Sequence, residues 1–271
     1  MTKLKDKFWL WGQDAGSHHA ASGNKSWKLP GTNRMGPAEG AAYLGINNMC
    51  RVVMCGTPVP RFDAESAKLG GMKQVVWSAI GDSGSVRNND NQSDLEEVLR
   101  QAEKYPNITG AILDDFFTGN ASRARHLPES IIKMRAQLHN FSKRPLDLWV
   151  VWYKRGLDFE IDDYLKIFDV ITYWNMRASA EFSELDDDIA KVIRRTPGKR
   201  RLAGCYMWNY GEGKPLTIPE IQAQCEKYHS WIKKGYIEGI IFCSNCCADL
   251  GLEAVEWTRN WIKEAGDEQI S

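Results

Sequence analysis

Runs of apolar residues recur along the chain, and nearly every run precedes a segment whose apolar residues are spaced as on one face of a helix. The runs are continuous rather than alternating, and they are rich in β-branched and aromatic residues. This composition is typical of parallel strands that are covered on both faces. The eight predicted strands are residues 7–14, 49–56, 73–82, 108–115, 146–153, 168–175, 201–209 and 236–245.

Helical segments occupy the intervals between these strands. One of them begins at Thr217, carries Pro219 in its first turn and ends at Gly235, and each residue type is favoured at that position. The predicted helices are residues 37–46, 63–71, 93–105, 128–141, 161–168, 183–196, 217–235 and 252–266.

Strands that alternate with helices in this way predict an α/β fold, a single (β/α)8 TIM barrel that spans residues 1–271 as one domain. A barrel of this kind needs roughly 250 residues. The alternative is a doubly wound open sheet, which usually carries a glycine-rich phosphate loop after its first strand. The segment "WGQDAGSHH", residues 11–19, does not match the GxGxxG pattern of that loop, so the sequence favours the barrel.

The charge balance excludes several classes of partner. Lys and Arg number 35 and so do Asp and Glu, which leaves no basic surplus for nucleic acid or an anionic membrane. No apolar run approaches the roughly 18 residues of a membrane span, and the start "MTKLKDKFWLWGQD" is too short in apolar residues for a signal peptide. We therefore expect a cytoplasmic protein, with a trimmed export signal as the alternative. The pattern leaves the oligomeric state open.

Seven cysteines are present, an odd number, and several lie within predicted strands, as Cys205 and Cys243 do. Their placement favours reduced, buried thiols. The segment "CSNCC", residues 243–247, could supply metal ligands together with Cys225 and His229, but the paired spacing of a structural zinc site is missing. We expect no metal and no cofactor.

The C-terminal ends of barrel strands carry the chemistry of this fold. Here those ends hold acidic, amide and aromatic residues, and the first basic residues among them are Lys154 and Arg155. Sugars present apolar C–H faces that stack on aromatic rings, and their hydroxyl groups need carboxylate or amide partners, so we expect a carbohydrate substrate. The candidate sugar-binding residues are Asp14, Trp77, Trp152, Tyr153, Tyr173, Trp174, Asn175, Trp208, Asn209 and Asn245. The alternative for the tryptophans is that they cap the barrel core.

The segment "GAILDDFF", residues 110–117, places Asp114 and Asp115 side by side at the end of an apolar strand. Two buried like charges are destabilising unless they are paired or used. Glycosidic bond cleavage usually needs two carboxyl groups, so the pair predicts a catalytic centre. On a regular strand the two side chains point to opposite faces, and Asp82, or else Asp14, would then supply the second carboxylate. Where the backbone leaves the pleat, both can reach the pocket.

The pair also has a structural interpretation. Asp115 could anchor the loop that follows, either by accepting backbone N–H bonds or by pairing with Arg123 or Arg125.

The stretch "AILDDFF" resembles the Asp-Asp pair of O-GlcNAcase-type glycoside hydrolases, which are (β/α)8 barrels. The resemblance implies that Asp114 orients the acetamide group of the substrate, which acts as the nucleophile, and that Asp115 is the general acid and base. "DVITYWN" and "WSAIGD" resemble strands of chitinase-like barrels, but the DxxDxDxE signature of those enzymes is missing. Strand 7 lacks a glutamate, and Asn175 replaces the strand-6 aspartate of α-galactosidase-like barrels, so the stereochemical outcome stays open.

Together these features predict a glycosidase that acts in carbohydrate metabolism, with Asp114, Asp115 and Asp82 as catalytic carboxylates. A carbohydrate-binding barrel without catalytic activity is one alternative. A lyase or isomerase acting on a sugar acid is another; it should show Arg or Lys at the mouth, and Lys154, Arg155 and Arg177 are the candidates.

Overall fold

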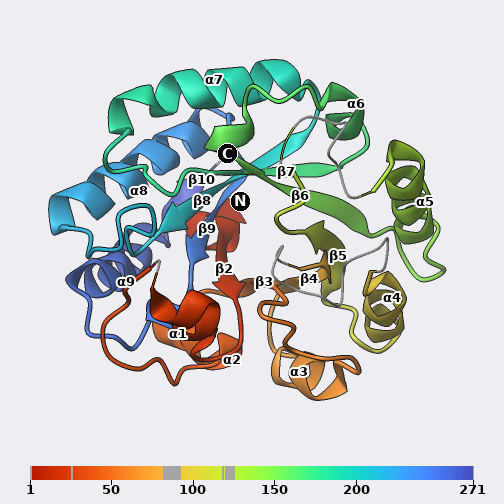
Figure 1. Cartoon of the computed structure of the whole chain (residues 1–271), viewed down its shortest axis with the longest axis horizontal. Coiled ribbons are helices and arrows are strands. Elements are labelled where there is room, and N and C mark those ends of the chain that lie inside the picture. The colour runs from red at the N-terminus through yellow and green to blue at the C-terminus, as the bar shows by residue number, and fades with distance from the viewer. Residues whose placement is uncertain (1, 26, 82–92, 118, 120–125, 271) are drawn as a thin grey trace. The chain divides into compact units, whose positions relative to one another are not determined.

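The computed structural model describes residues 2–25, 27–81, 93–117, 119 and 126–270. Within these residues, eight strands pair in chain order and the last pairs with the first, which gives a closed barrel (Figure 1). The predicted (β/α)8 fold is confirmed. The barrel strands are β2 (Phe8–Gly12), β3 (Asn48–Arg51), β4 (Gln74–Ile80), β5 (Ile108–Leu113), β6 (Asp147–Tyr153), β7 (Val170–Trp174), β8 (Arg200–Tyr206) and β9 (Gly239–Cys243).

A helix follows each strand, as the sequence pattern predicts. The N-terminus of α8 shows why the sequence predicts where this helix begins. The backbone N–H of Thr217 donates to Glu220 Oε2 at 2.7 Å, and a proline lies in the first turn of the helix. The helices that follow the strands are α2 (Pro37–Leu44), α3 (Asp63–Lys68), α4 (Leu95–Lys104), α5 (Pro128–His139), α6 (Asp162–Leu165), α7 (Leu185–Arg195), α8 (Ile218–Lys233) and α9 (Glu253–Ala265). A short extra helix, α1 (Ser17–Ala20), comes between β2 and α2.

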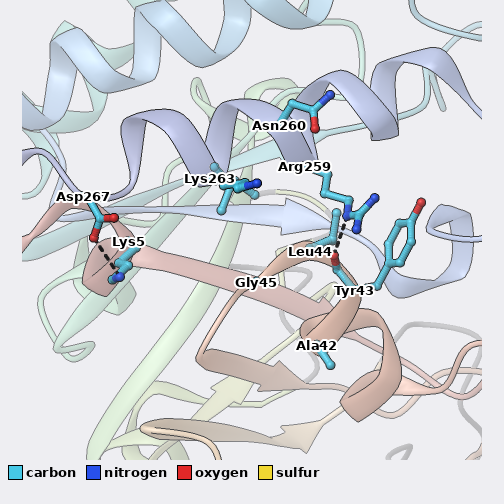
Figure 2. A pocket seen from close by; sticks show the side chains of 10 residues that line it. Lys5, Ala42, Tyr43, Leu44, Gly45, Arg259, Asn260, Lys263 and Asp267 are labelled. Carbon is cyan, nitrogen blue, oxygen red and sulfur yellow. Dashed lines mark hydrogen bonds and ion pairs between the residues drawn. The ribbon is translucent and has the colours of Figure 1, made fainter.

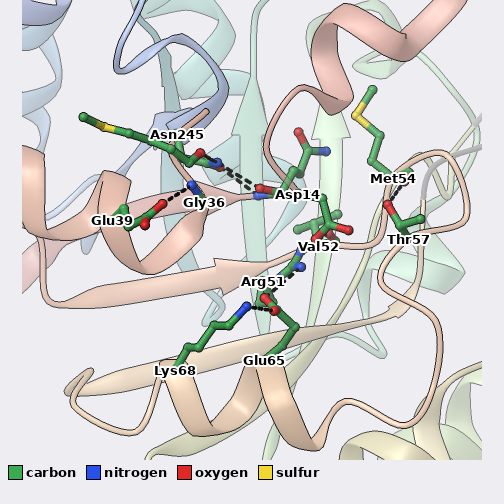
Figure 3. A network of polar contacts seen from close by, with 12 residues as sticks. Asp14, Gly36, Glu39, Arg51, Val52, Met54, Thr57, Glu65, Lys68 and Asn245 are labelled. Carbon is green, nitrogen blue, oxygen red and sulfur yellow. Dashed lines mark hydrogen bonds and ion pairs between the residues drawn. The ribbon is translucent and has the colours of Figure 1, made fainter. Parts of the chain in front are cut away.

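Strand β3 is shorter than the sequence predicts. It ends at Arg51, and the apolar residues after it form a tight turn in which the backbone groups of Met54 and Thr57 bond to each other at 2.8 and 3.0 Å (Figure 3). Cys55 lies in this turn with a left-handed φ of 52°, a conformation that a strand does not allow. The apolar run in the sequence therefore extends past the last residue of the strand.

The chain divides into two compact units. The first comprises Met1–Met49, Asn175–Asp186 and Leu202–Ser271, and it contains β2, β9 and all of β8 from Leu202 onward, with α2, α8 and α9. Its two ends pair as a small antiparallel sheet, β1 (Thr2–Lys3) with β10 (Gln269–Ile270), which the sequence pattern does not predict. The second unit comprises Cys50–Trp174 and Asp187–Arg201, and it contains β4 to β7 with α3 to α6.

All seven cysteines lie among the described residues as thiols and not as disulfides, and all but Cys55 are buried. Among the described residues, no helix has both the length and the apolar character that crossing a membrane requires. In the same part of the chain, His, Cys, Asp and Glu side chains do not gather in groups of three or more that could hold a metal ion.

Candidate active site

The adjacent aspartates follow directly after β5 in the second unit. The backbone N–H of Asp114 donates to the Ile80 carbonyl at 2.9 Å, so the pairing of β5 with β4 continues through this residue. Asp115 then takes a left-handed φ of 45°, and the chain leaves the strand. Its N–H donates to Asp114 Oδ1 at 2.9 Å. The rule that neighbouring side chains point to opposite faces therefore ends at Asp114.

Two residues show which face of this sheet carries the helices. The ring of Trp77 in β4 stacks on Phe62, with centroids 4.5 Å apart, and the Arg51 guanidinium lies 5.6 Å from the Trp77 ring. Arg51 is fully buried and reaches Glu65 Oε2 of α3 at 3.2 Å (Figure 3). Trp77 thus points toward α3, so its side chain faces the helices.

The alternation of β5 places Asp114 on the opposite face, in the barrel interior. Ala111 pairs with Trp77 and shares its helix-facing side, so Ile112 and Asp114 point inward. Cys50, next to the helix-facing Arg51, also points inward. Burial, and after it the Asp114 charge, raises the pKa of the Cys50 thiol, which indicates that the two groups are neighbours. Asp114 is only 4% exposed.

Asp115 lies in a more open environment, beside a cation. Arg155 Nη2 is 3.9 Å from Asp115 Oδ1, and the Asp115 side chain is 22% exposed. The guanidinium of Arg155 lies 4.9 Å from the ring centre of Tyr153, the last residue of β6. The two adjacent carboxylates therefore differ in their surroundings: one is enclosed and the other is accessible and near a positive charge.

Three of the predicted sugar-binding rings face the helices. Trp77 is one of them, because its ring stacks on Phe62 beside α3. Trp152 donates from Nε1 to the Gly156 carbonyl at 2.9 Å, and the Arg195 guanidinium of α7 lies 5.1 Å from its ring. Tyr173 donates to Asp188 Oδ2 of α7 at 2.7 Å. All three rings are at most 1% exposed, so none presents a face to a sugar, and they stand outside the candidate site.

The neighbouring rings point the other way. Tyr153 pairs with Trp174, and both alternate with the helix-facing pair of Trp152 and Tyr173. Trp174 donates from Nε1 to Thr172 Oγ1 at 2.8 Å and is nearly buried, whereas Tyr153 is partly exposed. Of the aromatic candidates in this unit, Tyr153 is the one with accessible surface beside the aspartate pair.

In the first unit, the asparagines predicted to bind sugar hold loops. Asn209 accepts a bond from Glu212 N at 3.0 Å and donates to Glu212 Oε2 at 2.9 Å. Asn175 donates to Glu181 Oε2 at 3.1 Å and accepts from Arg177 N at 2.9 Å. Both amides are almost fully buried. Their hydrogen-bonding capacity is used within the chain.

Asn245 has the same character. Its Oδ1 accepts from Gln13 N at 2.9 Å, and its Nδ2 donates to the carbonyls of Gln13 at 2.9 Å and Met35 at 2.8 Å. Trp208 donates from its indole to the Trp27 carbonyl at 2.9 Å and is 3% exposed. Asp14, in the loop after β2, is partly exposed. Asp82, the third catalytic candidate, lies outside the described residues, as do the arginines at 123 and 125.

A buried histidine cluster is a feature of the first unit that the sequence does not reveal. His18 Nδ1 lies 2.7 Å from the Tyr210 hydroxyl and 3.5 Å from Ser244 Oγ, and Nε2 bonds to Gln13 Oε1. Burial, and then the nearby His19, lowers the pKa of His18 to about 3, so the ring is neutral. Gln13 Oε1 only accepts, so Nε2–H donates to it and Nδ1 accepts the Tyr210 proton.

The residues of this cluster come from the ends of three strands. Gln13 follows β2, Tyr210 comes after β8, and Ser244 follows β9. A polar residue just past a strand end was the available signal at Gln13, but the long separation to Tyr210 hides the partnership. The cluster uses both imidazole nitrogens internally, so its function is to fix these loops in place.

A surface pocket of about 480 Å³ lies elsewhere in the first unit (Figure 2). Its lining includes Lys5, Tyr43, Arg259, Lys263 and Asp267. Lys5 precedes β2, and the α2 residues of the pocket are at the C-terminal end of that helix, so the pocket is at the end where strands begin.

Neither a protein-family model nor a curated protein sequence matches this chain. Solved structures do. A candidate α-L-fucosidase from Bacteroides thetaiotaomicron matches with a TM-score of 0.62 and 11% identity, over 99% of this chain and 98% of that one. An endo-β-N-acetylglucosaminidase from Cordyceps militaris matches with a TM-score of 0.56 and 14% identity, over 95% and 90%. A GH99 endo-α-mannosidase from Bacteroides thetaiotaomicron gives 0.53 and 10%, over 96% and 97%.

At these identities the likeness shows the fold: the chain has the eight-stranded parallel barrel that these glycoside hydrolases share.

Proposed function

We propose that this protein is a glycoside hydrolase in which Asp114 and Asp115 supply the two carboxyl groups of the reaction. The observation that carries the proposal is the contrast between these neighbours at the C-terminal end of a barrel strand. Asp114 is 4% exposed and interior, whereas the Asp115 side chain is 22% exposed and 3.9 Å from a guanidinium. Carboxyl groups in different environments are what acid catalysis of glycosidic cleavage uses.

Asp115 is the proposed proton donor. Its partial exposure lets water return the proton after each turnover, and Arg155 stabilises the carboxylate that remains once the proton has gone to the leaving oxygen. Asp114 is the proposed positioning and charge-stabilising carboxylate. Its Oδ1 accepts the Asp115 N–H, so it also holds the left-handed turn on which Asp115 stands. Asp114 would then orient the attacking water, or the acetamide nucleophile where the substrate carries one.

The test is hydrolysis of a panel of aryl glycosides, 2-acetamido sugars included, by the wild type, Asp114→Asn and Asp115→Asn. Either variant should lower kcat for the cleaved substrate by about 100-fold or more, the scale of general acid–base catalysis. Asp163→Asn is the matched control, because Asp163 is a highly exposed carboxylate of α6 with a lysine partner. It should leave kcat unchanged.

The leaving group separates the two roles. The 2,4-dinitrophenolate group leaves without being protonated, so Asp115→Asn should slow cleavage of a 2,4-dinitrophenyl glycoside far less than cleavage of a phenyl glycoside. Asp114→Asn should slow the cleavage of both. Full activity of both variants would refute the proposal. Sugar binding without any cleavage would replace it with the non-catalytic carbohydrate-binding barrel.

A further inference from the structure

The exposed guanidinium beside the aspartate pair has donors to spare. Arg155 belongs to a short 3-10 turn, Lys154–Gly156, directly after β6, and its side chain is 65% exposed. Its contacts with the described residues are the Tyr153 ring at 4.9 Å and Asp115 at 3.9 Å. The second distance exceeds that of a hydrogen bond. The planar, five-donor fork is therefore held in place while its N–H groups stay accessible.

The adjacent cation differs in this respect. Lys154 Nζ bonds to Asp188 Oδ2 at 2.8 Å, and the same oxygen accepts the Tyr173 hydroxyl at 2.7 Å. Both side chains of that ion pair are at least 80% buried, because they are 20% and 12% exposed. Asp188 of α7 therefore neutralises the charge of Lys154 in a buried environment. Arg155 is thus the cation at the end of β6 that can meet a ligand.

We infer that Arg155 binds a carboxylate on the substrate, so that the glycosides cleaved are those of uronic acids; this inference rests on the proposed function. A guanidinium pairs with a carboxylate through two parallel hydrogen bonds, a geometry that a hydroxymethyl group cannot reproduce. A uronic acid differs from the neutral hexose by this one substitution at C6. Stacking on Tyr153 orients the fork before the substrate arrives, which limits the entropy lost on binding.

The experiment compares substrates that differ only at C6: 4-nitrophenyl glucuronide with 4-nitrophenyl glucoside, and the galacturonide with the galactoside, each in both anomers. The wild type should favour the uronide. Arg155→Gln should lower kcat/KM for the uronide by about 10- to 100-fold more than for the neutral glycoside, and the extra loss should lie mainly in KM, since charge-assisted hydrogen bonds have this magnitude. A smaller loss in kcat that is common to both substrates would reflect the contact of Arg155 with Asp115. Arg155→Lys, which keeps the charge without the fork, should fall between.

Arg194→Gln is the matched control, an exposed arginine in the last turn of α7. It should change neither substrate, and circular dichroism of all variants checks folding. An equal loss on both members of a pair in Arg155→Gln would overturn the inference, because Arg155 would then serve Asp115 and not the substrate. A wild-type preference for the neutral sugar, or for a glucoside 6-sulfate over the uronide, would overturn it too.

Failure of the proposed function itself has a different signature. If the wild type cleaves nothing, calorimetric titration with D-glucuronate and D-glucose still tests Arg155 directly. In that case the absence of cleavage refutes hydrolysis, and glucuronate binding that Arg155→Gln abolishes would support the contact of Arg155 with a sugar carboxylate. Equal or absent binding of the two sugars would refute the inference as well.

Discussion

Replacing Asn245 with alanine should destabilise the protein strongly, even though its position past a strand end suggested a sugar-binding amide. The side chain is fully buried, and it makes three hydrogen bonds of 2.8–2.9 Å. Two of them pair with the N–H and the carbonyl of Gln13, as a neighbouring strand would, and the third reaches the Met35 carbonyl. Asn245 therefore acts as a backbone substitute at the end of β2.

The magnitude follows from these bonds. Each net hydrogen bond is worth about 1 kcal/mol, and the alanine leaves its partners in a buried site without replacements, so the free energy of unfolding should fall by about 3 kcal/mol. That is a large share of the roughly 5–15 kcal/mol that stabilises a typical domain. Asn260→Ala is the matched control, because Asn260 is an exposed residue of α9 where alanine favours the helix.

Urea unfolding followed by tryptophan fluorescence measures the effect, with equal m-values required for the comparison. Asn260→Ala should change the free energy of unfolding by at most about 0.5 kcal/mol. A loss in the free energy of unfolding below about 1 kcal/mol in Asn245→Ala, together with weaker sugar binding, would refute the reasoning. It would indicate that Asn245 contacts the sugar.

Two further predictions concern the first unit. The folded protein holds His18 neutral with a pKa of about 3, whereas an unfolded histidine titrates near 6.5. As the pH falls below 6.5, the unfolded chain therefore binds a proton that the folded protein does not bind. The free energy of unfolding that depends on the neutral ring is complete above pH 6.5 and is lost as the pH falls toward 3. Between pH 6 and 5 the loss is about 1 kcal/mol, so the difference in free energy of unfolding between wild type and His18→Gln should shrink by that amount; parallel pH profiles for wild type and His18→Gln would contradict this. Gly40→Ala in α2 should lower the free energy of unfolding by about 1–3 kcal/mol despite the better helix propensity of alanine, because its Cβ would lie 2.5 Å from Asn245 Cβ. A raised melting temperature would contradict this and show that the loop with Asn245 can move to make room.

The proposed catalytic pair shows how far local reasoning extends into the site. The strand before Asp114 and the break after it follow from the apolar run and its polar end. The left-handed backbone of Asp115 does not, because aspartate adopts that conformation only where surrounding contacts favour it. The pairing with Arg155 joins residues that are 40 positions apart in the chain. Such a contact has no local signature.

The sequence alone determined the order of strands and helices and hence the barrel, because apolar spacing and capping residues act over a few neighbouring positions. Only the tertiary structure decided which aromatic rings face the mouth. Trp152 and Tyr153 are adjacent and alike, yet one packs under Arg195 and the other supports Arg155. Parallel strands are covered on both faces, so both faces are apolar and the pattern cannot distinguish interior from helix side. The buried cluster of Gln13, His18 and Tyr210 has the same origin, since closing the barrel brings distant strand ends together.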